Sequence, residues 1–99
     1  MTSKAHEPIT PGEILLTEFL EPLGISQYRL AQATGLPQTR ISEIVRGKRS
    51  ITNDTALRFS RALGVDDRFW INVQVDYDLE VQRDRYGAEL DHVTALVPS

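Results

Sequence analysis

The chain contains no cysteine and only two histidines, so it offers few of the side chains that hold metals or act as nucleophiles. Without cysteine, disulfides and thiolate metal sites are excluded. His6 and His92 lie near opposite ends of the 99 residues, which argues against a metal site or a histidine-based catalytic pair. A glycine-rich phosphate loop is also absent. The sequence therefore predicts no metal, no cofactor and no enzymatic activity.

The chain also has no apolar run long enough to span a bilayer and no signal peptide. We therefore expect a soluble, cytoplasmic protein that does not bind membranes. Repeats, low-complexity tracts and linkers are missing as well, and 99 residues suffice for one modest core. These absences predict a single domain.

Capping residues and apolar spacing predict that this domain is all-α and has five helices. Thr10, Pro11 and Glu13 form a capping box with proline at the first helical position. The predicted helices cover about residues 11–21, 27–34, 37–46, 53–63 and 67–85, within a folded domain of residues 10–85. Residues 1–9 are expected to be a disordered arm, and the sequence leaves the conformation of the tail, residues 86–99, open.

Residues 26–47 give the most informative pattern, two short helices joined by a tight turn. Ser26 is suited to cap the first of them, and Gly35 stands where the backbone needs a positive φ. Ile41, Ile44 and Val45 form the inward stripe of the second helix. This spacing is typical of a helix-turn-helix, whose second helix enters the major groove of DNA. A glycine-turned helix pair in an ordinary bundle would show part of the same pattern.

The outward side chains of the second helix have the chemistry of base readers, because glutamine suits adenine, arginine suits guanine, and serine and threonine suit either. The predicted base-reading residues are Gln38, Thr39, Arg40, Ser42 and Glu43. The predicted phosphate contacts are Gln27, Arg46, Lys48 and Arg49, although Lys48 and Arg49 would also suit a solvated loop. Glu43 has two interpretations: it accepts a hydrogen bond from cytosine, or it pairs with Arg40 or Arg46.

The charge distribution is polarised, although the net charge of −3 is unusual for a DNA-binding protein. Residues 26–49 contain five basic side chains and one acid, whereas residues 50–99 contain five arginines and nine acids. Such a chain could bind nucleic acid with one face and a basic protein with another. The acids could equally serve only solubility.

The helix predicted over residues 67–85 has an apolar surface wider than a small core can cover. We expect a homodimer interface there, since large exposed apolar patches usually mark interfaces and a helix-turn-helix normally acts in two copies. The predicted interface residues are Phe69, Trp70, Val73, Tyr77 and Val81, and Ile71, Val75 and Leu79 extend the surface sideways. The alternative is that this helix packs deeper into its own core.

These motifs carry a family resemblance that covers residues 8 to about 84. Gln27, Ala31, Gly35 and Ile41 stand at the spacing of the phage-repressor (Xre/Cro) class, although Pro37 replaces the serine or threonine cap common in that class. The segments PGEILLTEFLEPLGISQYRLA, RISEIVRGKRSIT, DTALRFSRALG and FWINVQVDYDLE are similar to HigA-type antitoxins of toxin–antitoxin modules. The resemblance implies a lambda repressor-like helix-turn-helix domain with a longer C-terminal dimerisation helix.

The resemblance further implies an antitoxin that binds a HigB-type toxin, a RelE/ParE-like ribonuclease that cleaves mRNA. It also implies repression of its own operon through double-stranded operator DNA. Because such a toxin is basic, the acids Asp76, Asp78 and Glu80 are candidate toxin contacts, and the acids of the N-terminal segment are the alternative.

Two other functions remain open at the level of sequence. The first is a stand-alone transcriptional regulator without a toxin partner. The second is an enzyme that uses the paired carboxylates Glu18 and Glu21, although these more simply belong to a solvated helix face.

Overall fold

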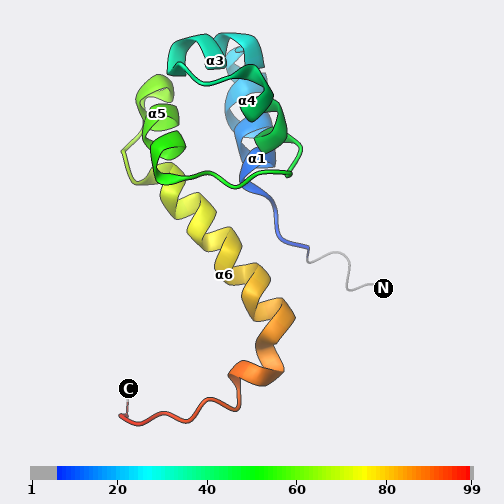
Figure 1. Ribbon diagram of the computed structural model, residues 1–99, viewed down its shortest axis with the longest axis vertical. Coiled ribbons are helices and arrows are strands. Elements are labelled where there is room, and N and C mark those ends of the chain that lie inside the picture. Colours follow the sequence, from blue (N-terminus) through cyan, green and yellow to red (C-terminus); the bar gives the residue numbers. More distant parts are fainter. Residues whose placement is uncertain (1–6, 99) are drawn as a thin grey trace.

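The computed structural model describes residues 7–98, and within them it contains helices and no strand. The first helix is a continuous run of α1 (Pro11–Ile14), η2 (Leu15–Leu20) and α2 (Glu21–Leu23). It is followed by α3 (Gln27–Thr34), α4 (Gln38–Val45), α5 (Asn53–Leu63) and α6 (Phe69–Leu90). Taking the first run as one helix, five helices form the described chain (Figure 1).

Side-chain caps start three of these helices, two of them at the predicted residues Thr10 and Ser26. The hydroxyl oxygens of Thr10, Ser26 and Thr52 accept hydrogen bonds from backbone N–H groups three residues further along, at 3.1, 3.0 and 3.3 Å. The first helix widens into π-helical geometry over Leu15–Leu20, which ends two residues before Pro22. Because proline cannot donate a backbone hydrogen bond and its ring crowds the preceding turn, it favours such an irregularity.

The core is formed where the first helix and α3–α5 meet the start of α6. Leu15, Ile41, Phe59 and Trp70 are completely buried. The indole of Trp70 contacts the rings of Phe19, Phe59 and Phe69, with ring centroids 5.1 to 5.8 Å apart. This aromatic cluster anchors the N-terminal end of α6 in the helical body.

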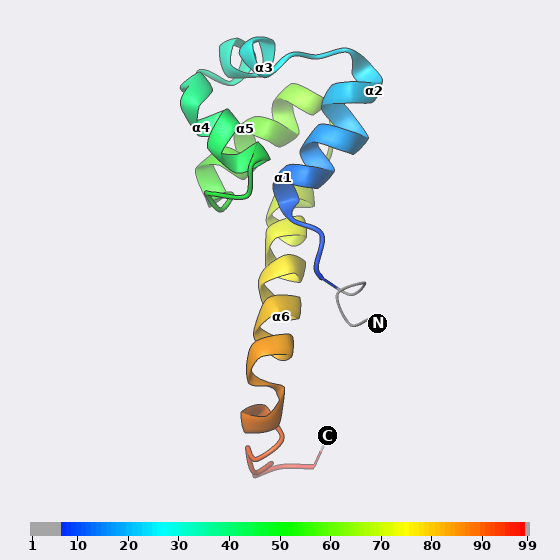
Figure 2. The ribbon, with the colours of Figure 1, turned by 90° about the vertical axis from the view of Figure 1, so that its right-hand side faces the viewer.

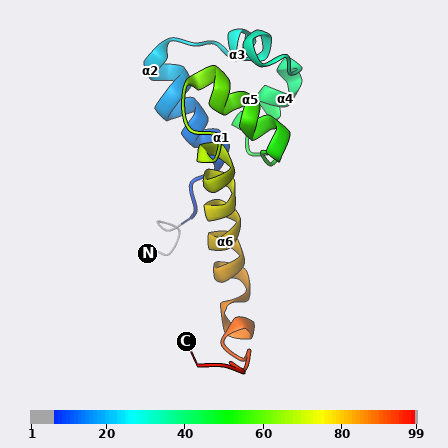
Figure 3. The ribbon, with the colours of Figure 1, turned by 90° about the vertical axis from the view of Figure 1, so that its left-hand side faces the viewer.

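Beyond this anchor α6 projects away from the body as a long arm, which Figures 2 and 3 show from opposite sides. The molecule measures 48 × 36 × 21 Å along its principal axes, and α6 runs obliquely to the longest of them in Figure 1. The helix α3 lies at the end of the body away from α6, and α4 lies along the side of the body (Figure 2).

The C-terminal helix is longer than the sequence predicts. Its regular geometry breaks at Tyr86, with φ −119° and ψ 18°, one residue after the predicted end at about 85. The helix nevertheless resumes through Gly87 and ends at Leu90, because a glycine weakens a helix without having to end it. Residues 1–6 of the arm expected to be disordered lie outside the described residues, and residues 7–9 have no helical structure.

Candidate nucleic-acid interface

The turn between α3 and α4 has the geometry that the sequence predicts. Gly35 adopts φ +74°, and its N–H donates to the carbonyl of Ala31 at 2.9 Å. Arg58 of α5 fixes the same turn, because its Nη1 donates to the carbonyl of Thr34 at 2.7 Å while its Nε donates to Asp54. A third helix therefore holds the end of α3 at the turn.

The recognition helix α4 buries Ile41 and Ile44 and turns its polar side chains outward. Gln38 and Thr39 are exposed, whereas Arg40, Ser42 and Glu43 are half-buried. Pro37 precedes the helix in an extended conformation and provides no side-chain cap. The exposed start of α4 is therefore the part of this helix best placed to enter a groove.

Glu43 has a partner that the sequence does not predict. Its Oε1 accepts a hydrogen bond from Nε of Arg49 at 2.7 Å, rather than pairing with Arg40 or Arg46. This ion pair joins α4 to the loop that follows it, and both side chains remain partly exposed. Arg46 and Lys48 are exposed beside it, and Gln27 at the start of α3 is half-buried.

Gln74 is a residue that sequence reasoning misses. It lies on α6 and is 7% exposed. Its Oε1 accepts from the N–H of Ile51 at 2.8 Å, and its Nε2 donates to Asp78 at 2.9 Å. The basic loop 46–50 therefore ends in a hydrogen bond to α6. The only feature of the sequence that could have indicated this role is the position of a glutamine within the apolar pattern of the helix.

The apolar side chains of α6 divide between two faces. Phe69, Val73, Tyr77 and Val81, four of the predicted dimer residues, are half-buried. Trp70, the fifth, is 0% exposed because it fills the core of its own chain, so it has no surface to offer a partner. This part of the prediction is corrected.

Other apolar side chains of α6 remain exposed to solvent, namely Val75, Leu79, Tyr86 and Leu90 at 39–49%. At 100° per residue, Val75 and Leu79 point away from Val73 and Tyr77. Two of the three residues predicted to extend the interface sideways, Val75 and Leu79, therefore belong to the exposed set, whereas Ile71 is half-buried.

The three acids predicted to meet a toxin do not share one face. Asp76 and Glu80 are one turn apart and line a groove together. Asp78 lies on another side of α6, where it accepts the hydrogen bond from Gln74.

Among residues 7–98, no cluster of histidine, cysteine, aspartate or glutamate is arranged to hold a metal ion. None of the helices described here has the length and apolar character needed to cross a membrane.

Comparison with known proteins agrees with this architecture. The helix-turn-helix family profile matches residues 16–70. Virulence-associated protein I of Dichelobacter nodosus is 51% identical over 73 residues, which are 74% of this chain and 68% of that protein. Antitoxin HigA-1 of Vibrio cholerae is 36% identical over 99 residues, which are 100% of this chain and 93% of the relative.

A solved structure extends the likeness to three dimensions. The antitoxin HigA of Pseudomonas aeruginosa, solved with the higBA promoter, superimposes with a TM-score of 0.83 at 35% identity. The match covers 91% of this chain and 99% of that one. The chain therefore belongs to the helix-turn-helix family and has its lambda repressor-like fold. Within that family it is a homologue of the HigA-type antitoxins, and it is a regulator of this kind rather than an enzyme.

Proposed function

We propose that this protein is an operator-binding repressor and antitoxin that acts as a homodimer. The observation that carries the proposal is the superposition of nearly the whole chain on a HigA antitoxin solved with promoter DNA. The outward side chains at the start of α4 support it, because they suit the base edges of the major groove. Gln38, Thr39 and Arg40 would read bases, with Ser42 further along the helix.

Phosphate contacts would come from Gln27 and from the loop after α4. Arg46 and Lys48 are exposed and make no hydrogen bond or ion pair through their side chains within residues 7–98. Arg49 is held by an ion pair with Glu43. Glu43 could therefore act in either of two ways. It positions Arg49 toward the backbone, or it exchanges that partner for a cytosine amino group when DNA binds.

Two copies would be needed to read two half-sites, and α6 supplies a surface for pairing them. Val75 and Leu79, with Tyr86 at the break and Leu90 beyond it, form an exposed apolar surface on the projecting helix. Pairing of these surfaces would bury apolar area that a monomer leaves in water.

The second half of the proposal is that the protein neutralises a HigB-type ribonuclease. The curated HigA relative is similar over the whole length of this chain. The acidic C-terminal half suits a basic partner, and its exposed acids would speed association at low salt. By this proposal the protein acts in the cytoplasm, where both the DNA and the toxin's mRNA substrate are found.

The DNA half of the proposal is tested by contrasting Arg40→Ala with Lys48→Ala. Arg40→Ala should reduce the preference for the operator over unrelated DNA about 5- to 160-fold, since a base contact contributes about 1–3 kcal/mol. Lys48→Ala should weaken binding to both DNAs alike and lower the salt slope by about 1.

Fluorescence anisotropy with the promoter fragment and a scrambled duplex, at several salt concentrations, measures both quantities. Arg83→Ala on the projecting helix is the control and should change neither. If Arg40→Ala and Lys48→Ala weaken all DNA equally, α4 does not read bases as proposed.

The toxin half is tested by co-purification with the protein encoded beside this chain. The proposal is supported if the co-purified protein is basic, has a similar size, and shows no ribonuclease activity while it is in the complex. Operator binding without such a partner would leave a stand-alone transcriptional regulator.

A further inference from the structure

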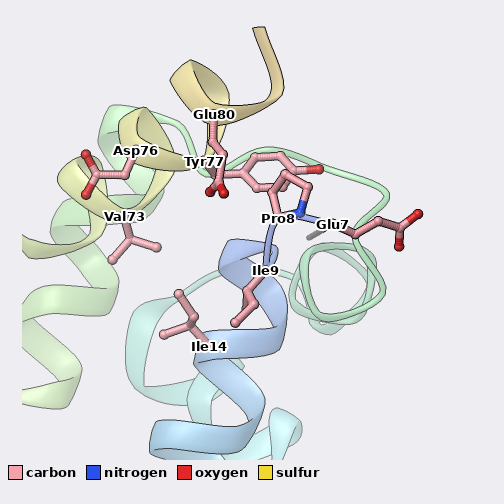
Figure 4. A pocket seen from close by; sticks show the side chains of 8 residues that line it. All are labelled: Glu7, Pro8, Ile9, Ile14, Val73, Asp76, Tyr77 and Glu80. Atoms are coloured by element: carbon pink, nitrogen blue, oxygen red, sulfur yellow. The ribbon is translucent and has the colours of Figure 1, made fainter. Parts of the chain in front are cut away.

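A groove runs between the N-terminal segment and α6. Its volume is about 420 Å³. Pro8, Ile9 and Ile14 line one side, and Val73 and Tyr77 of α6 line the other (Figure 4). Ile9 is 57% exposed, so this apolar side chain faces solvent rather than the protein interior.

Carboxylates stand at the edge of this apolar groove. Asp76 and Glu80 lie one turn apart on α6 and belong to its lining, as does Glu7. Asp76 and Glu80 make no hydrogen bond or ion pair with any side chain in the described part of the chain, including Arg83 one turn further along. Two like charges at this spacing repel each other. Because no cationic side chain of the described residues pairs with either carboxylate, both negative charges remain uncompensated.

An apolar groove with two uncompensated carboxylates has the features that bind an arginine or lysine side chain. The aliphatic stem of such a residue packs on apolar surface while its charged head remains at the edge. A guanidinium or ammonium group there would form charge-assisted hydrogen bonds with carboxylates. A hydrated metal ion would gain nothing from the apolar half of the groove, and DNA would be repelled.

We infer that this groove receives a basic side chain of the toxin, an inference that rests on the toxin binding proposed above. A second copy of this chain fits less well, because residues 50–99, which include α6, are acidic overall, with five arginines and nine acids. Asp78 is not part of the groove, since it holds Gln74 in place. The toxin surface is therefore narrowed to Asp76, Glu80 and the apolar residues beside them.

The test compares two variants that each remove two negative charges. One is Asp76→Asn/Glu80→Gln in the groove. The other is Glu18→Gln/Glu21→Gln on the first helix, where both side chains are exposed and make no interaction within residues 7–98. The probe is the basic protein encoded beside this chain, and calorimetry measures its dissociation constant.

The groove variant should raise that dissociation constant at least tenfold, and the first-helix variant less than twofold. Ile9→Ser, which changes an exposed side chain, should also weaken toxin binding. All three variants should bind operator DNA as the unmodified protein does, which shows that they are folded.

Three results would overturn the inference. Equal toxin affinity of the two charge variants, with the toxin still bound by the unmodified protein, removes the groove but leaves the proposed function intact. Loss of binding only in the first-helix variant moves the toxin surface to the N-terminal acids. If the unmodified protein does not bind the toxin probe at all, the toxin half of the proposed function fails and the inference fails with it.

Discussion

At the scale of single residues, Gly12 has the strictest requirement in the fold. A Cβ atom at this position would lie 1.8 Å from the carbonyl oxygen of Ile44 and 2.9 Å from the Cα of Val45. Both are backbone atoms of α4, so no side-chain rotation can relieve the clash. The first helix and the recognition helix therefore cross at a distance that only glycine permits.

Gly12→Ala should consequently destabilise the protein by about 1–3 kcal/mol or more, because the two helices must move apart. Urea denaturation followed by circular dichroism measures this loss. Gly87→Ala is the matched control, since its Cβ would meet nothing within 4 Å and its backbone has no positive φ. That variant should be neutral or stabilising by up to about 1 kcal/mol. Equal stability of the two variants would show that the crossing can relax.

At the scale of elements, the helix-turn-helix could be predicted from sequence because its signals are local. Ser26 caps α3, Gly35 adopts the positive φ that ends it, and Ile41 and Ile44 face inward, all within one short segment. The ion pair between Glu43 and Arg49 depends on how the loop after α4 folds back. The hydrogen bond from Ile51 to Gln74 depends on contact between segments that are distant in the sequence. Spacing along the chain contains no information about such contacts.

The orientation of α6 is the other feature that sequence could not give. The helix has apolar residues on two faces, so periodicity alone does not say which one turns inward. The structure resolves this because Trp70 enters the aromatic cluster, which fixes the rotation of the whole helix. Val75 and Leu79 are thereby left outside.

The hydrogen bond from Ile51 to Gln74 connects the basic loop 46–50 to α6, and Gln74→Leu would remove it. The buried N–H of Ile51 would lose its partner, which should cost about 1–3 kcal/mol of stability. We further expect faster hydrogen exchange in the loop 46–51 and weaker binding to all DNA sequences, because the loop positions the basic side chains.

Hydrogen-exchange mass spectrometry and the anisotropy assay measure these two effects. Asp78→Ala is the control, because it removes the second bond of Gln74 and keeps the one to Ile51. Unchanged exchange in Gln74→Leu would mean that the loop is held by other contacts.

At the scale of the whole molecule, α3 lies at the end of the body away from α6, and α4 lies along the side of the body (Figure 2). The loop after α4 reaches α6, where the N–H of Ile51 donates to Gln74. A partner bound to the projecting end of α6 would therefore leave the start of α4 uncovered. The charges are divided along the chain, with the basic block in residues 26–49 and the acids concentrated beyond residue 50.

The proposed pairing through α6 would also raise the affinity of this protein for an operator. Two recognition helices on one duplex must reach half-sites about 34 Å apart, and joining them raises the affinity beyond that of either alone.

Leu79→Asp places a charge in the exposed apolar surface of α6 and should shift the protein to monomers at micromolar concentration, as light scattering would show. Operator affinity should then fall at least tenfold, while the helical content remains unchanged because Leu79 is 45% exposed. Leu23→Asp introduces the same change at another exposed leucine, 59% exposed and far from that surface, and should leave the assembly intact. If Leu79→Asp remains dimeric, the two copies pair through a different surface, and the half-buried face with Val73 and Tyr77 becomes the next one to test.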